Sequence, residues 1–452
     1  MTVNVESLKK VYFLGIGGIG MSALARYLNS AKVQVHGYDR TPTTLTSQLE
    51  KEGISIHFSD LPELLTDDFD IVVYTPAIPE SLAEYRKAVK MNIPMMKRSE
   101  LLGLLTKSNK TLAVAGTHGK TTVSSMLAHI LYSSSQGCTA FLGGISKNYD
   151  SNLLINHSSH YMVTEADEFD RSFLRLYPWL AIITSADADH LDIYQNHETL
   201  LQAFAEFTSH ISTDGYLLIK QGIELPFTTS INHIYTYSIT EEADFAIENL
   251  LLINGKYSFT LLTPEGAIEG FNPILPGLFN VENCIAAAAA AWLSGTKPLD
   301  IIKGINTFLG VKRRFDHRVI KPDFLYIDDY AHHPEELKAC ITSVRKLYPG
   351  KKITGIFQPH LYTRTRDFAE GFASSLSLLD QLILLDIYPA REKPIAGVTS
   401  QMLLDMTPID NKMLLSKEQA IAYIKNHKPD ILLTLGAGDI DKLVTVIEKL
   451  FI

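Results

Sequence analysis

The chain has 452 residues, which at about 150 residues per domain predicts roughly two to four domains, with three as the natural first division. Hydrophobic residues make up 46% of the chain and charged residues 20%, so each third has enough apolar surface to build a core. The 41 basic and 50 acidic residues give a formal net charge of -9 without any lysine- or arginine-rich run, which argues against nucleic acid as a partner.

The cysteines and the apolar runs indicate where the protein works. Cys138, Cys284 and Cys340 lie far apart and fit neither a disulfide framework nor a zinc knuckle, as expected in a reducing compartment. The N-terminus has no apolar segment and cleavage site of the kind found in a signal peptide, and the longest apolar run, 285–293, is far shorter than the roughly 18 residues of a membrane span. We therefore expect a cytoplasmic protein without membrane insertion.

The first third of the chain, residues 1–107, alternates short β-branched or aromatic runs with stretches of helical period. This alternation is typical of a parallel sheet with crossover helices, as in doubly wound nucleotide-binding folds. The strand-like runs are 11–17, 33–39 and 70–77, and the helix-like stretches are 21–31, 44–53 and 81–90.

Two further α/β units follow, and the polar stretch 106–110 marks the first boundary. In the second unit, residues 245–270 predict a hairpin with a turn at 254–256. The alternation of strand-like and helix-like runs begins again near Gly310, which marks the second boundary. Strand-like runs in these units are 111–116, 160–167, 179–187, 215–220, 324–331, 351–360, 381–388 and 430–439. The sequence thus predicts an α/β fold of three domains: a Rossmann-like unit (1–107), a central P-loop ATPase-like unit (108–309) and a Rossmann-like unit (310–452).

A glycine-rich turn lies between the first predicted strand and the first predicted helix. Asp39 closes the next strand, 19 residues after the last glycine of the turn. Such glycines permit a tight turn and the approach of a pyrophosphate to a helix N-terminus. The pattern favours a diphosphate-containing ligand over a purely structural turn, but it does not choose NAD over a UDP-sugar. The candidate ligand-binding residues of the G-x-G-x-x-G turn are Gly15, Gly17, Gly18, Ile19 and Gly20.

A second phosphate-binding pattern opens the central unit, again between a strand and a helix. It resembles a P-loop, in which backbone amides surround phosphates, a lysine neutralises the β and γ oxygens and a hydroxyl ligates Mg²⁺. The strict pattern has glycine where this chain has Val114, and Gly116 supplies the flexibility instead. We expect ATP to bind at Gly116, Thr117, His118, Gly119, Lys120, Thr121 and Thr122.

Two acidic segments, 164–170 and 187–192, come at the ends of predicted strands of the central unit. Because the carboxyl ends of parallel strands meet at one crevice, a carboxylate and a histidine can reach a metal ion held by Thr121. We expect Glu165 and His190 to be metal-site residues; a solvated acidic loop is the alternative for most of the other charges.

In the last unit, His, Arg, Tyr and Asp gather in 328–334 and 358–366, directly after apolar strands. Adjacent His332 and His333 would point to opposite sides of an extended chain, so a shared zinc is improbable, and one of them could simply cap the next helix. An arginine fork suits carboxylate or phosphate, which makes Arg364 a candidate substrate contact. The basic stretch 310–315 is either functional or a solvated linker.

The order of these motifs resembles the Mur ligase family across essentially the whole chain. The resemblance rests on GIGGIGM, AGTHGKTT, TEADEFD, DADHLD, GLFNVENCIAA, GVKRRF, DDYAHHP, QPHLYTRTRD, DIYPAREKPI and LGAGDI, and the AHHP and QPHxYTR forms are similar to those of the branch that handles UDP-N-acetylmuramate directly. It implies an ATP- and Mg²⁺-dependent ligase that activates the lactyl carboxylate of UDP-N-acetylmuramate as an acyl phosphate for attack by L-alanine. Lys120 and Mg²⁺ would offset the repulsion between the two anions.

The resemblance also implies a role for each matching residue. The glycine turn and Asp39 would hold the UDP end, in residues 1–107, and the C-terminal unit would close over the site and exclude water. ATP would be bound by the P-loop residues together with Asn280 and Asn283 at the adenine, Arg314 at the γ-phosphate and Asp329 at the ribose. His332, His360 and Arg364 would face the sugar-nucleotide or the alanine. The implied catalytic residues are Lys120, His190, Arg314 and His332, and the implied metal ligands are Thr121, Glu165 and His190.

Several positions depart from the usual family pattern. Phe279 stands where a histidine usually precedes the asparagine, Ser185 and Asp187 replace the usual Asn and Glu, and Leu361 occupies a position that is often arginine. Sister ligases carry a carbamylated lysine for a second Mg²⁺. No lysine lies between His190 and Lys220, so we expect an uncarbamylated site.

Three alternatives stay open at the level of the sequence. A recycling ligase that attaches a preformed tripeptide to UDP-N-acetylmuramate would share most of the motifs. A nicotinamide-dependent oxidoreductase would explain residues 15–20 but leave the Gly-Lys-Thr-Thr segment unexplained, and an ATP-regulated binding protein would explain the P-loop without any chemistry. We expect a monomer or a weak homodimer.

Overall fold

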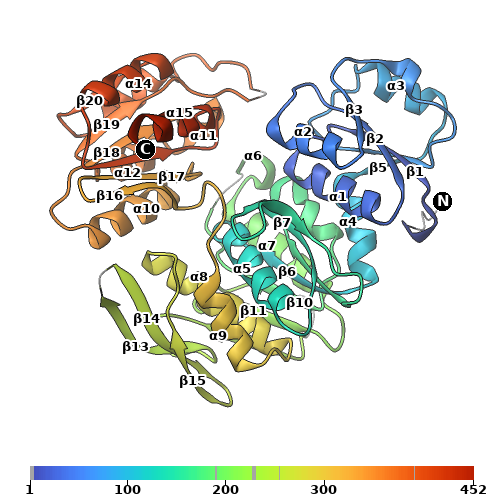
Figure 1. Cartoon of the computed structure of the whole chain (residues 1–452), viewed down its shortest axis with the longest axis horizontal. Coiled ribbons are helices and arrows are strands. Elements are labelled where there is room, and N and C mark those ends of the chain that lie inside the picture. Colours follow the sequence, from blue (N-terminus) through green and yellow to red (C-terminus); the bar gives the residue numbers. More distant parts are fainter. Residues whose placement is uncertain (1–4, 189–190, 227–230, 254, 391) are drawn as a thin grey trace. The chain divides into compact units, whose positions relative to one another are not determined.

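The computed structural model describes residues 5–188, 191–226, 231–253, 255–390 and 392–452. Its described strands form four sheets, and helices follow many of the strands of the three larger ones (Figure 1). The chain divides into two compact units. The first consists of Met1–Leu250, Ser258–Asn272 and Glu282–Leu309, and the second of Leu251–Tyr257, Pro273–Val281 and Gly310–Ile452.

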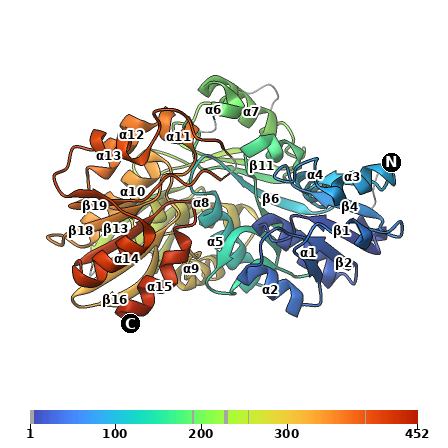
Figure 2. The ribbon, with the colours of Figure 1, turned by 90° about the horizontal axis from the view of Figure 1, so that it is seen from above.

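The N-terminal sheet is parallel and has the order β3-β2-β1-β4-β5. Because the order reverses between β1 and β4, the carboxyl ends of these two strands form a topological switch point, where open α/β sheets bind ligands. Figure 2 shows α1 and α2 on one face of this sheet and α3 on the other. The elements are β1 (Lys10–Leu14), α1 (Ile19–Ser30), β2 (Gln34–Tyr38), α2 (Thr44–Lys51), β3 (Ser55–His57), β4 (Ile71–Tyr74), α3 (Ala83–Lys90), β5 (Met95–Lys97) and α4 (Arg98–Lys107).

The central sheet has the order β12-β11-β10-β6-β9-β7-β8, with all strands parallel except β8, which pairs antiparallel with β7. Helix α5 follows β6 and packs against β6, β7, β9 and α9. The elements are β6 (Lys110–Ala115), α5 (Lys120–Ser133), β7 (Thr139–Ser146), β8 (Ser151–Leu154), β9 (Tyr161–Glu165), η3 (Phe169–Arg175), β10 (Leu180–Ile183), α6 (Leu191–Tyr194), α7 (His197–Thr208), β11 (Tyr216–Lys220), β12 (Ile234–Tyr237), α8 (Leu278–Leu293) and α9 (Pro298–Thr307).

A buried hydrogen-bond cluster joins α1 to β8. The amide Nδ2 of Asn152 donates to the carbonyl oxygen of Ile19 (2.6 Å) and to Ser22 Oγ (3.0 Å), and Asn152 Oδ1 accepts from Arg26 Nη1 (2.6 Å). Asn152 and Ser22 are fully buried. The helix that follows the glycine turn is therefore fastened to the central sheet by polar contacts as well as by packing.

The predicted hairpin at 245–270 is part of a three-stranded sheet of order β13-β14-β15. Its strands are β13 (Ala246–Ile253), β14 (Lys256–Thr263) and β15 (Gly266–Phe271), and β14 pairs antiparallel with β15. Asn254, in the predicted turn, lies outside the described residues. The sequence pattern therefore gave the hairpin's position, and the structure adds a third strand inside the predicted range.

The C-terminal sheet has the order β16-β17-β21-β18-β19-β20, parallel except for β16. The four predicted strands of this unit correspond to β17, β18, β19 and β21, and their buried residues include Tyr326, Ile356, Ile383 and Leu432. The elements are β16 (Asp316–Lys321), β17 (Phe324–Asp329), α10 (Pro334–Leu347), β18 (Ile353–Phe357), α11 (Tyr362–Asp367), α12 (Ala369–Leu376), β19 (Gln381–Leu384), α13 (Ser400–Met406), β20 (Lys412–Leu414), α14 (Lys417–Asn426), β21 (Ile431–Leu435) and α15 (Asp441–Phe451).

Two expectations about the cysteines and about membrane spans can be compared directly with the structure. Cys138, Cys284 and Cys340 are free and buried, so the prediction that they form no disulfide framework is confirmed. Across the described ranges, no helix combines the length and the apolar character that a membrane crossing requires.

Candidate active site

The P-loop lies where the sequence predicts it, between β6 and α5. Gly116 has φ +131° and Gly119 has φ +82°, both in the left-handed region that favours glycine. A methyl group on Gly116 would lie 2.3 Å from Thr184 Oγ1, so the turn needs glycine for space as well as for conformation. Val114 is a buried residue of β6, paired with Ile182 and Glu165. The strand therefore continues through the position where the strict pattern has glycine.

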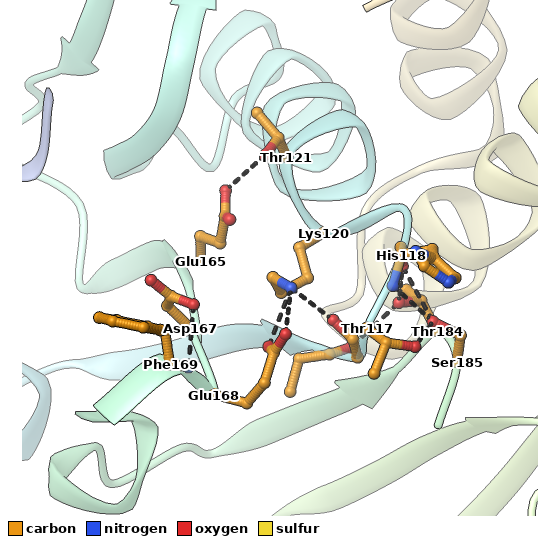
Figure 3. Close-up of polar contacts among 12 residues, drawn as sticks. Thr117, His118, Lys120, Thr121, Glu165, Asp167, Glu168, Phe169, Thr184 and Ser185 are labelled. Carbon is orange, nitrogen blue, oxygen red and sulfur yellow. Dashed lines mark hydrogen bonds and ion pairs between the residues drawn. The ribbon is translucent and has the colours of Figure 1, made fainter. Parts of the chain in front are cut away.

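Lys120 begins α5 and is held by two groups of the protein (Figure 3). Its Nζ donates to the carbonyl oxygen of Gly116 (2.7 Å) and lies 2.9 Å from Oε1 and 2.8 Å from Oε2 of Glu168, a fully buried residue. Burial alone would lower the pKa of Lys120, but the carboxylates of Glu168, Asp167 and Glu165 raise it above its ordinary value. The lysine is thus a charged group, positioned against the turn that is expected to hold phosphates.

Glu168 was not among the residues singled out from the sequence. Burial raises the pKa of its carboxyl to about 7, and Lys120 opposes that rise. Its backbone oxygen accepts a hydrogen bond from Tyr194 Oη (2.6 Å). The acidic segment 164–170 is therefore not simply a solvated loop, because one of its carboxylates is the buried counter-ion of the P-loop lysine.

Thr121 and Glu165, the two described members of the expected metal site, are in direct contact. The hydroxyl of Thr121 donates to Glu165 Oε2 over 2.8 Å (Figure 3). A methyl group on Gly143 of β7 would lie 1.8 Å from the same oxygen, so the carboxylate needs glycine on the neighbouring strand. Hydroxyl and carboxylate oxygens are hard donors that suit Mg²⁺, which usually keeps several waters and phosphate oxygens as its other ligands. His190 lies outside the described residues.

The end of β10 shapes the other side of the P-loop. Ser185 Oγ accepts from the backbone amide of His118 (2.6 Å) and lies 3.0 Å from Thr117 Oγ1. The backbone amide of Asp187 donates to Thr117 Oγ1 (3.1 Å), and His118 Nε2 lies 3.6 Å from Asp187 Oδ2. Ser185 and Asp187, which depart from the family pattern, thus contact the P-loop directly in this chain. Thr184, whose hydroxyl bonds to the carbonyl oxygens of Ala115 and His118, was missed by the sequence reasoning.

The two asparagines expected at the adenine lie near the start of α8. A methyl group on Gly119 would lie 2.9 Å from Asn283 Oδ1, so Asn283 is close to the P-loop turn. Asn280 is buried, and its Nδ2 donates to the carbonyl oxygen of Pro276 (2.7 Å). Phe279 packs edge-to-face against Phe315, with ring centroids 5.6 Å apart, so the departure from histidine gives an apolar contact here.

The glycine turn of the N-terminal sheet also has the predicted form. Gly15 has φ +86°, and a methyl group on it would lie 2.9 Å from Thr75 Cγ2, at the end of β4. The backbone amide of Gly17 donates to Asp39 Oδ2 (2.7 Å), and the amide of Thr41 donates to Asp39 Oδ1 (3.1 Å). Asp39 is therefore bound to the turn itself, where a dinucleotide-binding protein would use this carboxylate on a ribose.

In the C-terminal unit, Asp329 lies at the end of β17 and accepts from two backbone amides, those of Phe315 (2.6 Å) and Ala331 (2.7 Å). Burial raises the pKa of its carboxyl to about 6, although Arg314 lowers it. Arg314 lies 4.9 Å from the ring of Tyr330. The basic stretch 310–315 is thus not a freely solvated linker.

His332 and His360 are brought together by the ends of β17 and β18. Their rings are 6.1 Å apart and perpendicular, and His360 stacks on Tyr388 at 5.8 Å. His332 Nδ1 lies 3.2 Å from Glu336 Oε2. His333 is the N-cap residue of α10 but makes no capping bond through its side chain; its ring packs on Phe368 at 4.7 Å. The two adjacent histidines thus have different surroundings.

Arg364 lies in α11 and is buried. The residue before this helix, Leu361, has φ +69°, which is unusual for a residue with a branched side chain. Glu392 holds the start of α11: its Oε2 accepts from the amides of Tyr362 (2.6 Å) and Thr363 (3.1 Å). The sequence reasoning missed Glu392, because 30 residues separate it from its partner Tyr362.

Family models match three consecutive parts of the chain: the Mur ligase family, catalytic domain, at residues 10–110, the Mur ligase middle domain at 114–291, and the Mur ligase, glutamate ligase domain at 313–438. The UDP-N-acetylmuramate–L-alanine ligase of Parabacteroides distasonis is 51% identical over 99% of this chain and 98% of its own length. The crystal structure of the UDP-N-acetylmuramate-alanine ligase MurC from Thermotoga maritima matches with a TM-score of 0.82 and 26% identity, over 97% of this chain and 98% of that one.

A murein peptide ligase from Psychrobacter arcticus has the same fold, with a TM-score of 0.72 and 21% identity over 98% of each chain. The order of the motifs, the three sheets that carry them and the similarity over nearly the full length agree. The chain therefore belongs to the Mur ligase family.

Proposed function

We propose that this chain is an ATP-dependent ligase that joins L-alanine to the lactyl carboxylate of UDP-N-acetylmuramate, in the synthesis of peptidoglycan precursors. The observation that carries the proposal is the pair of contacts on the P-loop, Lys120 with Gly116 and Glu168, and Thr121 with Glu165. The similarity to relatives named for this reaction supports the choice of substrates.

The chemistry requires an activated carboxylate, because a carboxylate anion resists attack by an amine. ATP supplies the phosphoryl group that turns it into an acyl phosphate with a good leaving group. Lys120 would hold the β and γ oxygens and offset the charge repulsion between the two anions. The backbone of 116–119 and the residues Thr117, His118, Thr122 and Asn283 would surround the nucleotide.

We propose Mg²⁺ at Thr121 and Glu165, with His190 as a further ligand. The donor atoms of the two described residues already lie 2.8 Å apart and are of the type that Mg²⁺ prefers. Bound there, Mg²⁺ would neutralise charge on the phosphates. Within the described ranges no cluster of three or more His, Cys, Asp or Glu side chains could hold a metal ion, so this proposal relies on phosphate and water as the remaining ligands.

The remaining site residues keep the roles that the resemblance implies, as proposals. Gly15 to Gly20 and Asp39 would form the site for the UDP end, in a domain of residues 1–107. Asn280, Arg314 and Asp329 would complete ATP binding, and His332, His360 and Arg364 would bind the sugar-nucleotide or the amino acid. The domain boundaries 108–309 and 310–452, a cytoplasmic location and a monomer or weak homodimer are part of the same proposal.

The deciding assay is release of ADP by the purified protein with ATP and Mg²⁺. We expect release that requires both UDP-N-acetylmuramate and L-alanine, and release that depends on neither substrate would contradict the proposal. Comparing L-alanine with the tripeptide L-alanyl-γ-D-glutamyl-meso-diaminopimelate as acceptor separates this activity from that of a recycling ligase. A faster reaction with the tripeptide would reassign the acceptor.

A further inference from the structure

Arg98 lies against the last glycine of the N-terminal turn. It is the first residue of α4, directly after β5, and is half-buried. A methyl group on Gly20 would lie 2.9 Å from Nη1, 3.1 Å from Cδ and 3.4 Å from Cζ of Arg98. Gly20 has no unusual φ, so a side chain at this position would displace the arginine and would not strain the backbone.

The surroundings of Arg98 differ from those of comparable arginines. Arg26 pairs with Glu52, Arg313 with Asp328 and Arg318 with Glu448. In the described part of the chain, the side chain of Arg98 forms no ion pair or hydrogen bond. A guanidinium group offers five N–H donors in a planar fork that fits a phosphate.

The position of Arg98 coincides with the switch point of the sheet. Gly15, after β1, is next to Thr75, after β4, and Arg98 follows β5, the neighbour of β4. Ligands of open α/β sheets bind in the crevice at such strand ends. The residues that follow three neighbouring strands, Gly15, Thr75 and Arg98, therefore lie at the edge where a ligand of the N-terminal sheet is expected.

The hydrogen bonds of the turn indicate which of its ends receives an anion. The amide of Gly17 is already bound by the carboxylate of Asp39, which would repel a phosphate at that end. The amides of Ile19 and Gly20 belong to the first turn of the twelve-residue helix α1, whose N–H groups have no acceptor within the helix. Arg98 lies at this second end, beside Gly20.

We propose that Arg98 binds the diphosphate of the UDP-sugar, at the Gly20 end of the turn and away from Asp39. This inference rests on the proposed function and adds a residue that binds the negatively charged part of the substrate. Arg98 distinguishes a nucleoside diphosphate from the uncharged nucleoside, because its fork contacts phosphate oxygens alone. Gly20 acts as a positioning residue, since it leaves the space in which the arginine lies.

The test is calorimetric titration of the full-length protein with UDP and, separately, with uridine. In Arg98→Ala we expect the Kd of UDP to rise about 10- to 100-fold, as for loss of a charged hydrogen-bonded partner, with the Kd of uridine changed less than about two-fold. Gly20→Ala should weaken UDP in the same selective way, although alanine is the better helix former. Lys90→Ala, on the exposed end of α3, is the matched control and should bind both ligands like wild type.

Each outcome decides the assignment. If Arg98→Ala binds UDP within about two-fold of wild type, or loses UDP and uridine equally, Arg98 does not bind the diphosphate. Arg98→Lys serves as the second variant if the alanine protein does not fold; it keeps the charge without the fork and should fall between the two. Failure of the wild-type protein to bind either UDP or UDP-N-acetylmuramate would instead contradict the proposed function.

Discussion

Individual charged side chains in this chain have specific partners, and Lys120 is the clearest case. It is half-buried, carries its charge between Glu168 and the Gly116 carbonyl, and adjoins the threonine that contacts Glu165. A net charge of -9 does not attract polyanionic substrates, so we infer that binding depends on individual cations such as Lys120, Arg314 and Arg364.

Replacing Lys120 by alanine should therefore abolish most of the activity. We expect the rate of ADP release to fall at least about 100-fold, because the variant lacks the cation that is proposed to stabilise charge in the transition state. Lys303→Ala, an exposed lysine of α9, is the control and should keep the wild-type rate. Near-normal turnover by Lys120→Ala would refute the phosphate-binding role.

His129 is a second buried residue whose charge state matters, and it predicts how stability changes with pH. Burial lowers the pKa of its imidazole to about 4, and its nitrogens lie 2.7 Å from Tyr149 Oη and 2.9 Å from Thr307 Oγ1. The unfolded chain binds a proton on this residue near pH 6.5, so between about pH 6.5 and 4 it takes up more protons than the folded protein.

The folded state should therefore lose stability as the pH falls through this window, by up to roughly 3 kcal/mol from this residue. Urea unfolding at pH 7 and pH 4.5 measures the effect in wild type and in His129→Gln. The variant should be less stable at pH 7 but less sensitive to pH. An equal pH dependence in both proteins would show that His129 is not the group responsible.

At the scale of elements, the contact between α1 and β8 depends on one buried side chain. Asn152→Ala removes three hydrogen bonds and leaves the carbonyl of Ile19, the hydroxyl of Ser22 and the guanidinium of Arg26 without that partner. We expect a loss of roughly 2–3 kcal/mol in the free energy of unfolding, because Asn152, Ser22 and Arg26 are buried. Urea titration measures it, and Asn232→Ala, with one surface hydrogen bond, is the control. A loss below about 0.5 kcal/mol would mean that packing alone joins the two elements.

The elements themselves follow well from the sequence, whereas contacts between them do not. The alternation of runs predicted the inner strands that carry the motifs in all three large sheets, but it missed shorter or outer strands such as β3, β5, β7 and β16. The glycine turns at 15–20 and 116–119 lie where they were predicted, with positive φ at Gly15, Gly116 and Gly119. Local conformation and strand-end position depend on near neighbours in the chain, which a single sequence contains.

Pairings across the sheet were not predictable in the same way. Glu168 binds a lysine 48 residues away, Asn152 binds helix α1 at a separation of 126 to 133 residues, and Gly143 is required by Glu165 on a neighbouring strand. No local pattern marks Asn152 or Gly143, because their partners are set by sheet order. For Glu168, the acidic segment 164–170 that follows the P-loop in the sequence was an available cue.

For the whole molecule, the proposed ATP site predicts stabilisation by nucleotide. ADP with Mg²⁺ at about 100 times its Kd should stabilise the folded protein by roughly 2.7 kcal/mol and raise the thermal midpoint by a few degrees. Thermal unfolding followed by intrinsic fluorescence measures the shift. Lys120→Ala should show a much smaller one, and NADH at the same concentration should give none. A shift with NADH alone would favour the oxidoreductase reading of residues 15–20.

The buried cluster of Asn152, Ser22 and Arg26 also has a consequence for protein engineering. A chimaera that exchanges the N-terminal sheet and its helices for those of another ligase would keep Asn152 on β8 but replace α1. Asn152 would then lose its buried partners Ser22 and Arg26. The first hundred residues thus cannot be exchanged between ligases without changes elsewhere in the chain. A working exchange would have to include β8 together with α1. Because of the same contacts, a sequence change in the α1 residues after the turn at 15–20 would require a matching change in β8 of the central sheet.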